Sequence, residues 1–206
     1  TGVAAITSTF TQGNLTHVEN PFSVALEGDG FFQIRTESGE LQYTRDGSFE
    51  ISPVANGNML CTSDGNPVLD AYGNQIILPS NRVATDLVVN QDGTLAFPDG
   101  TGNPAVITDA NGRPVKFGIY QFNNPAGLSK EGSNNYSVTV ASGAAVAENG
   151  NAAVKQTKTH QYYTEASNVD VANEMVNLIV AQRAYEMNSK AIQASDEMMQ
   201  QANALR

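Results

Sequence analysis

The chain carries two hydrophobic patterns, which meet near residue 167. Before that point, short β-prone runs alternate with dipeptides that favour turns. Asp-Gly occurs at 29–30, 46–47, 64–65, 92–93 and 99–100, and Asn-Gly occurs at 56–57, 111–112 and 149–150. Such pairs accept the positive φ that tight hairpins require. The pattern predicts an all-β body built of hairpins, with strands at 22–26, 31–35, 41–45, 48–51, 75–78, 86–89, 114–122 and 136–140.

The last part of this body has a simpler composition. Residues 141–156 are mostly Ala, Gly, Asn and Val, and we interpret them as an exposed loop. A final strand is expected at 154–164, where β-prone residues return. The segment 4–15 is equally β-prone, so pairing between the two would bring the ends of the body together.

Residues 170–204 predict one long helix. They contain no Gly and no Pro and are rich in Ala, Met, Gln, Glu and Leu, which lose little rotamer freedom in a helix. Residues 167–170 supply capping side chains just before it. At 1.5 Å per residue the helix would be about 50 Å long, which exceeds an ordinary globular helix.

The apolar positions of this helix indicate what it packs against. One stripe, interrupted by Asp196, has alternating spacings of three and four residues, and a second stripe adds further apolar positions. Together they cover more than half of the circumference, so we expect neighbours on several sides, with heptad packing against at least one partner helix. The alternative is a long core helix around which the β segment wraps. The first stripe comprises Met175, Leu178, Gln182, Tyr185, Ser189, Ile192 and Met199; the second comprises Val176, Ile179, Val180, Met187, Ala191, Ala194, Met198 and Leu205. The residues predicted to make helix–helix assembly contacts are Met175, Leu178, Ile179, Gln182, Tyr185, Ser189, Ile192 and Met199.

The charge is concentrated in the body. Of the net charge of −10, residues 1–150 carry −9 (15 acidic, 6 basic) and residues 151–206 carry −1 (6 acidic, 5 basic). An acidic body repels phosphates, so neither nucleic acid nor anionic lipid is an expected partner. No run of about 18 uncharged apolar residues predicts a membrane span. The chain begins at Thr1 without a basic and apolar leader, and we interpret it as a cut or processed fragment.

No catalytic, cofactor-binding or metal-binding residue is predicted. His17 and His160 each stand alone in a β-like stretch, without the converging ligands of a zinc site or the partners of a triad. The Asp-Gly pairs lack the ladder of acidic residues of an EF-hand. Cys61 is the only cysteine and is expected to be a small buried hydrophobe. An enzyme is therefore the least favoured class.

Four stretches, in order along most of the chain, resemble the flagellar basal-body rod and hook protein family. They are residues 20–34 (NPFSVALEGDGFFQI), 43–49 (YTRDGSF), 124–128 (NPAGL), and 165–170 (EASNVD) continued by 174–176 (EMV) and 182–191 (QRAYEMNSKA). The residues that we single out from these motifs are Gly28, Gly30, Phe31, Phe32, Tyr43, Arg45, Gly47, Phe49, Asn124, Pro125, Ser167, Asn168 and Val169. The C-terminal motif and the modest body are most similar to distal rod members.

The resemblance implies a structural subunit without chemistry. Such subunits are exported unfolded through the flagellar type III apparatus, stack helically with copies of themselves and with neighbouring rod or hook subunits, and form a tubular shaft that transmits torque to the hook. It also implies an N-terminal helix that pairs with the C-terminal one. We therefore divide the chain into an extended linker or first strand (1–20) that would join that helix, a β-rich body (21–166) and an assembly helix (167–206). Two alternatives remain: a proximal rod or hook subunit, and a β-rich surface adhesin with a helical stalk.

Overall fold

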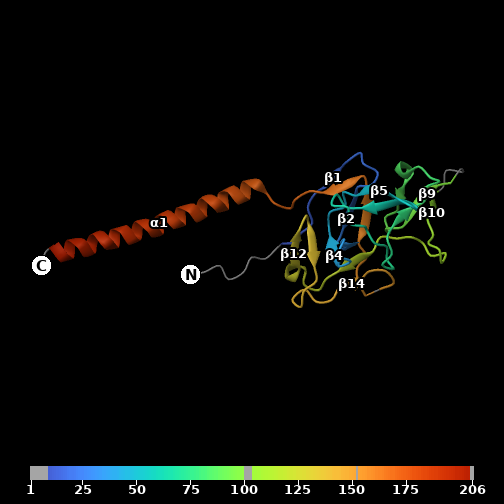
Figure 1. Cartoon of the computed structure of the whole chain (residues 1–206). Helices are drawn as coiled ribbons and strands as arrows, with labels where there is room; N and C mark the ends of the chain where they lie inside the picture. Colours follow the sequence, from blue (N-terminus) through green and yellow to red (C-terminus); the bar gives the residue numbers. More distant parts are fainter. Residues whose placement is uncertain (1–8, 100–103, 152, 205–206) are drawn as a thin grey trace. The chain divides into compact units, whose positions relative to one another are not determined.

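Short antiparallel strands make up the first part of the structure, a computed structural model that describes residues 9–99, 104–151 and 153–204. The largest sheet has six strands in the order β12 (Ser129–Gly132), β13 (Asn135–Ser137), β4 (Leu41–Thr44), β3 (Phe31–Arg35), β11 (Ile119–Gln121) and β14 (Val146–Ala147). Two three-stranded sheets have the orders β5 (Glu50–Val54), β6 (Gly57–Cys61), β7 (Ile77–Leu78) and β10 (Pro104–Val106), β9 (Leu95–Pro98), β8 (Val88–Val89). In Figure 1, β9 and β10 lie at the end of the β body opposite to β12.

Two two-stranded ribbons complete the β body. The first pairs β2 (Val24–Glu27) with β15 (Lys158–Gln161), and the second pairs β1 (Leu15–His17) with β16 (Tyr163–Glu165). The chain divides into one compact unit that ends at Ser167 and a second that begins at Asn168 and contains the helix α1 (Val171–Ala204). The fold class predicted from the sequence, a hairpin-rich β body followed by a long C-terminal helix, is confirmed.

Several strand predictions were wrong in detail. The expected single strand 154–164 is two strands, because Tyr162 adopts a left-handed φ of 65° between β15 and β16 and redirects the chain. The expected loop 141–156 contains β14, which pairs with β11. The expected strand 114–122 is reduced to β11, and β6, β9, β10 and β12 were not predicted. Of the expected strand 4–15, residues 4–8 lie outside the described residues, and of the remainder only Leu15 belongs to a strand.

The main core is aromatic at its centre. The ring of Phe32 meets Phe49 edge-to-face at 5.0 Å and Phe117 at 5.2 Å, and Phe49 stacks on Phe117 at 5.8 Å between centroids. All three side chains are fully buried, and aliphatic residues from several sheets surround them. A second, smaller cluster contains Phe31, Tyr43, Phe122 and Leu128. Burying a large apolar side chain stabilises a fold by about 1.5–3 kcal/mol, so these two clusters hold strands of two to five residues together.

One turn is used repeatedly in the described body. In five segments the carbonyl of the first residue accepts the N–H of a glycine at the fourth position, and the first N–H donates to the carbonyl of the fifth residue. The glycine has a φ of 75–87° in each, as the bulged three-residue hairpin loop requires. The turns at the Asp-Gly and Asn-Gly dipeptides were predicted from the sequence, but this shared five-residue pattern was not. The segments are Thr36–Glu40, Thr62–Asn66, Asp70–Asn74, Asn90–Thr94 and Asp109–Arg113.

Gly30 and Gly47 are needed for a different reason than the one expected. Neither has a positive φ, so the prediction that their Asp-Gly pairs form left-handed turns was wrong. A Cβ on Gly47 would collide with the carbonyl oxygen of Val24, and a Cβ on Gly30 would lie 2.5 Å from Ile119 Cγ2. Both positions therefore need glycine because other segments approach the backbone too closely for any side chain.

We predict that Gly47→Ala destabilises the body by about 3 kcal/mol or more, because backbone atoms must move to admit the methyl group. Gly39→Ala is the matched control. Gly39 has a φ of 87° but open space around it, so only the conformational cost of about 1–2 kcal/mol is expected. Urea unfolding of both variants measures the difference, and equal destabilisation would contradict the steric account.

A second prediction concerns pH. His160 Nε2 lies 2.7 Å from Glu27 Oε2 across the β2–β15 ribbon, and this hydrogen bond lowers the pKa of Glu27 below 4.5. A lowered folded-state pKa means that the stabilisation is present above the unfolded-state pKa and is lost as the pH falls through the folded-state value. His160→Ala should return the pKa of Glu27 toward 4.5, as measured by carboxyl NMR titration. An unchanged titration curve would exclude the hydrogen bond as the cause.

Candidate functional site

The helix α1 begins at a well-formed N-cap. Asp170 Oδ1 accepts the N–H of Ala172 at 3.0 Å, and Asp170 Oδ2 accepts Asn173 Nδ2 at 2.8 Å. The carbonyl of Asp170 accepts the N–H of Glu174, which is the first turn of helical bonding. The bond to Asp170 Oδ1 satisfies the N–H of Ala172, which has no intrahelical partner. The capping prediction from residues 167–170 therefore falls on Asp170.

The apolar side chains of α1 are exposed around its circumference. Leu178 is 58% exposed, Tyr185 77% and Ile192 64%, and no described side chain of the helix is buried. Met175, Ile179, Gln182, Ser189 and Met199 share this exposure, and Leu205 of the second stripe lies outside the described residues. Exposed apolar side chains gathered on one element are typical of interaction surfaces, and the assembly contacts of these residues stay a prediction.

The predicted seam of α1 has an internal order. Leu178, Tyr185, Ile192 and Met199 recur at intervals of seven residues and form its apolar row. The neighbouring heptad row begins with Met175 and continues with Gln182, Ser189 and Asp196, so it is mostly polar. A polar residue at such a position weakens helix pairing but selects the register and the partner.

The phenylalanines of the sequence motifs belong to the two core clusters. Phe32 and Phe49 lie in the main core, and Phe31 and Tyr43 lie in the smaller one. Burial raises the pKa of Tyr43, whose hydroxyl lies 3.2 Å from Gln33 Nε2. The structure thus places these four motif residues in packing roles.

Arg45 lies at the meeting point of other motif residues. Its Nη1 donates to the carbonyl oxygens of Gly28 and Gly30, both at 2.9 Å, and its Nε donates to Glu165 Oε2 at 2.9 Å. Its Nη2 lies 2.9 Å from the same carboxylate oxygen, in an ion pair not aligned for a hydrogen bond. The guanidinium carbon lies 5.7 Å from the ring centre of Phe31. We name Arg45, Glu165 and the two glycine carbonyls the clasp.

The remaining motif residues lie elsewhere. Pro125 begins a short 3₁₀ turn, Pro125–Gly127, and Asn124 Nδ2 donates to the carbonyl of Ala141 at 2.9 Å. Ser167, Asn168 and Val169 connect β16 to α1, and their side chains are exposed. The structure therefore gathers Gly28, Gly30, Phe31 and Arg45 at the clasp, but not these five.

Sequence reasoning missed two carboxylates that organise the body. Glu165 lay within a motif, but no role was assigned to it. Glu148 was assigned to an exposed loop, yet it is 3% exposed and accepts hydrogen bonds from Thr157 N, Thr157 Oγ1 and Gln121 Nε2 at 2.6–2.7 Å. The surrounding Ala, Gly and Asn gave no signal of this burial, because the partners of Glu148 lie nine and 27 residues away, outside its local pattern.

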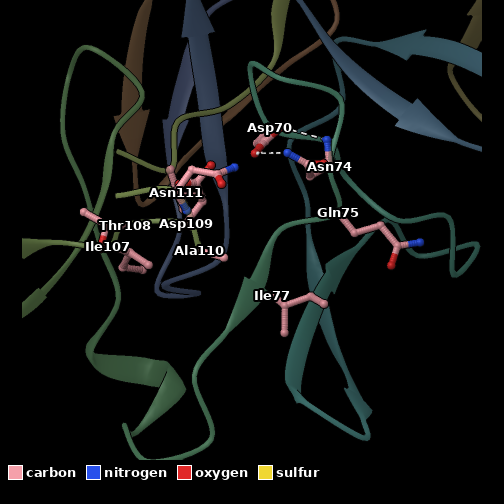
Figure 2. Close-up of a pocket in the computed structure, with 10 residues that line it drawn as sticks. Asp70, Asn74, Gln75, Ile77, Ile107, Thr108, Asp109, Ala110 and Asn111 are labelled. Carbon is pink, nitrogen blue, oxygen red and sulfur yellow. Dashed lines mark hydrogen bonds between the residues drawn. The ribbon is translucent and has the colours of Figure 1, made fainter. Parts of the chain in front are cut away.

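A hollow on the body surface lies between two of the repeated turns, Asp70–Asn74 and Asp109–Arg113 (Figure 2). Asp70 accepts the N–H groups of Tyr72 and Asn74, and Asp109 accepts those of Asn111 and Arg113. Both carboxylates thus serve their own turns. Within the described ranges no three acidic, His or Cys side chains gather as a metal site, and no described helix is long and apolar enough to cross a membrane.

A hairpin-rich β body joined to a helix with apolar side chains exposed all around it is typical of subunits that assemble with others. The model of the flagellar hook protein FlgE/F/G D1 domain matches residues 25–97, and that of the flagellar basal body rod FlgEFG protein C-terminal region matches residues 160–205. The chain belongs to the flagellar basal-body rod and hook protein family.

Similar proteins cover almost the whole chain. The flagellar basal-body rod protein FlgG of Borreliella burgdorferi is 39% identical over 210 residues, which span all of this chain and 72% of that protein. FlgG of Caulobacter vibrioides is 36% identical, over 95% of this chain and 68% of its own length. The flagellar hook-basal body complex protein FlhP of Bacillus subtilis is 34% identical, over 95% and 69%.

We predict that Asp170→Ala lowers the stability of α1 by about 1 kcal/mol, because the capping bond to the N–H of Ala172 and the side-chain bond to Asn173 disappear. Asp170→Asn is the matched control, since an asparagine oxygen caps as well as a carboxylate. The helical circular dichroism signal at 222 nm, followed during heating, should fall earlier in the alanine variant alone. Identical curves for the two variants would show that the cap does not stabilise α1.

Proposed function

We propose that this chain is a structural subunit of the bacterial flagellar basal-body rod, of the distal rod type, and that it is not an enzyme. The exposed apolar circumference of α1, in a member of this family, is the observation that carries the proposal. The relatives named FlgG favour the distal rod over a proximal rod or hook subunit. The competing prediction, a surface adhesin with a helical stalk, finds no support among these relatives.

The subunit works by packing. Copies of the chain, with neighbouring rod and hook subunits, stack helically through α1, and the β bodies form the wall of a tube that transmits torque to the hook. A shaft needs many simultaneous contacts, and an exposed helix with apolar side chains on several sides provides them. We also propose export through the flagellar type III apparatus to the cell envelope, where the rod is built.

The seam of α1 restricts its partner. Two copies of α1 paired in parallel and in register would place Asp196 against Asp196, and like charges at this distance repel. We therefore propose that the seam faces a helix of different sequence, such as the N-terminal helix that the family resemblance implies. In this division residues 1–20 lead to that helix, 21–166 form the wall and 167–206 form the assembly helix.

The proposal predicts that Leu178→Asp or Ile192→Asp, introduced into the gene of the source bacterium, abolishes rod assembly and swimming. Both side chains are exposed in the single chain, so the β body should melt at its normal temperature. Within the assembled seam, a charge in place of a buried Leu or Ile costs at least the roughly 2–5 kcal/mol of a truncation to Ala. Motility plates and electron microscopy of basal bodies provide the readouts.

Two control variants accompany this test. Asn177→Asp adds the same charge one residue away from Leu178, off the seam, and Glu186→Gln removes a charge from a polar position. Bacteria that carry either control variant should still swim. Export of each variant is measured separately, because failed export would also abolish motility. An exported and folded Ile192→Asp subunit that builds working rods would overturn the assembly role of α1.

A further inference from the structure

The segment before β1 is fixed to the body although it is not a strand. The ring of Phe10 packs edge-to-face on Phe31 at 5.6 Å and on Tyr136 at 5.2 Å. The side chain of Gln12 donates to the carbonyl of Leu26 at 2.6 Å and accepts the N–H of Gly28 at 3.1 Å. Residues 10–14 therefore lie along the end of β2 and the turn that follows it.

This segment meets the chain that leads into α1. The N–H of Ala166 donates to the carbonyl of Asn14 at 2.9 Å, which extends the pairing of β1 with β16 by one step. The N–H of Val18 donates to the carbonyl of Tyr162 at the other end of the ribbon. We name residues 10–18 and 162–166 the two arms. Each is short, so the bonds of a ribbon this size give little stability by themselves.

Glu165 fastens both arms to the body. Its Oε1 accepts the N–H of Gly13 from one arm at 2.9 Å, while its own backbone belongs to the other arm. Its Oε2 binds Arg45, which follows β4 of the six-stranded sheet and also holds the carbonyls of Gly28 and Gly30. The side chains of Arg45 and Glu165 are 16% and 13% exposed, so water screens the pair weakly.

We propose that the clasp is the point at which mechanical load passes between the β body and the chain leading into α1. That this segment carries load rests on the proposed function, but the contacts by which the clasp fastens it to the body do not. A pull on Ala166 along β16 would otherwise open the short ribbon one bond at a time. The clasp instead connects β16 to the largest sheet and to the turn after β2, so the bonds must break together. Arg45 and Glu165 are thus positioning residues for the segment 162–166, which leads into α1.

Hydrogen exchange of the folded 206-residue chain tests the fastening. The reporters are the amides of Ala166 and Val18, whose hydrogen bonds involve neither mutated side chain. In Glu165→Gln and Arg45→Lys these amides should exchange about tenfold faster or more, because charge-assisted bonds that close the arms are lost. Amides of β3 should keep their rate. Unchanged reporters in both variants, or equal acceleration in β3, would overturn the proposal.

Arg113→Lys is the matched control. Arg113 also pairs its guanidinium with a carboxylate, that of Asp109 at 2.7 Å, but within a single turn of the body. Arg113→Lys removes a comparable guanidinium–carboxylate pair. The amide protons of Ala166 and Val18 should exchange at the same rate as in the parent chain. Acceleration equal to that in Glu165→Gln would mean that any lost ion pair loosens the arms, which would overturn the proposal.

Single-molecule pulling tests the load itself. Handles are attached through Lys130→Cys on β12 and Val171→Cys at the start of α1; Cys61 is buried, and burial raises the pKa of its thiol, so it does not compete. Glu165→Gln should lower the force of the first rupture, and Arg113→Lys should not. Equal first-rupture forces in the parent and Glu165→Gln would refute the load path. The measurement uses isolated chains, so its failure is distinct from a failure of rod assembly.

Discussion

The packing of Phe32 against Phe49 and Phe117 is the interaction on which the β body depends. Strands this short contribute few ladder bonds, so apolar side chains must hold the sheets together. Phe49 reaches the core because the preceding chain lies directly on the backbone of Val24, where Gly47 leaves room for the carbonyl oxygen. The residues of the motif 43–49 therefore act together. Tyr43 and Phe49 fill the two cores, Gly47 permits the close approach to Val24, and Arg45 binds Glu165.

The clasp fastens the two arms, residues 10–18 and 162–166, to this β body. Arg45 uses its donors on two carbonyl groups and one carboxylate, which a lysine could not reach at once. The carboxylate belongs to a motif 120 residues away along the chain. Two motifs that look independent in the sequence are therefore halves of one contact. Their joint presence ties residues 162–166, which lead into α1, to the largest sheet of the body.

The elements that local residue chemistry specifies were predicted from the sequence, and those that depend on contacts with other segments were not. The bounds of Phe31–Arg35 were correct, and α1 begins one residue after the expected position, because a β-prone run next to a turn dipeptide and a helix-favouring composition specify such elements locally. Strands such as Ser129–Gly132, with all four residues exposed and two charged, carry no hydrophobic signal and exist through pairing with a neighbour. Likewise, no pattern around Glu148 revealed its burial, since Thr157 and Gln121 create its site. The assembly residues of α1 remain a prediction.

The polar row beside Leu178, Tyr185 and Ile192 has a consequence for how a subunit of this kind would polymerise. A seam in which three of the eight positions are Gln, Ser and Asp makes the pairing of any two helices weak, so free pairs would dissociate quickly. A subunit arriving at the end of a growing filament would touch several neighbours at once, and the combined affinity would retain it. Growth would then be nucleated: elongation on an existing template would be fast, and spontaneous initiation in solution would be rare.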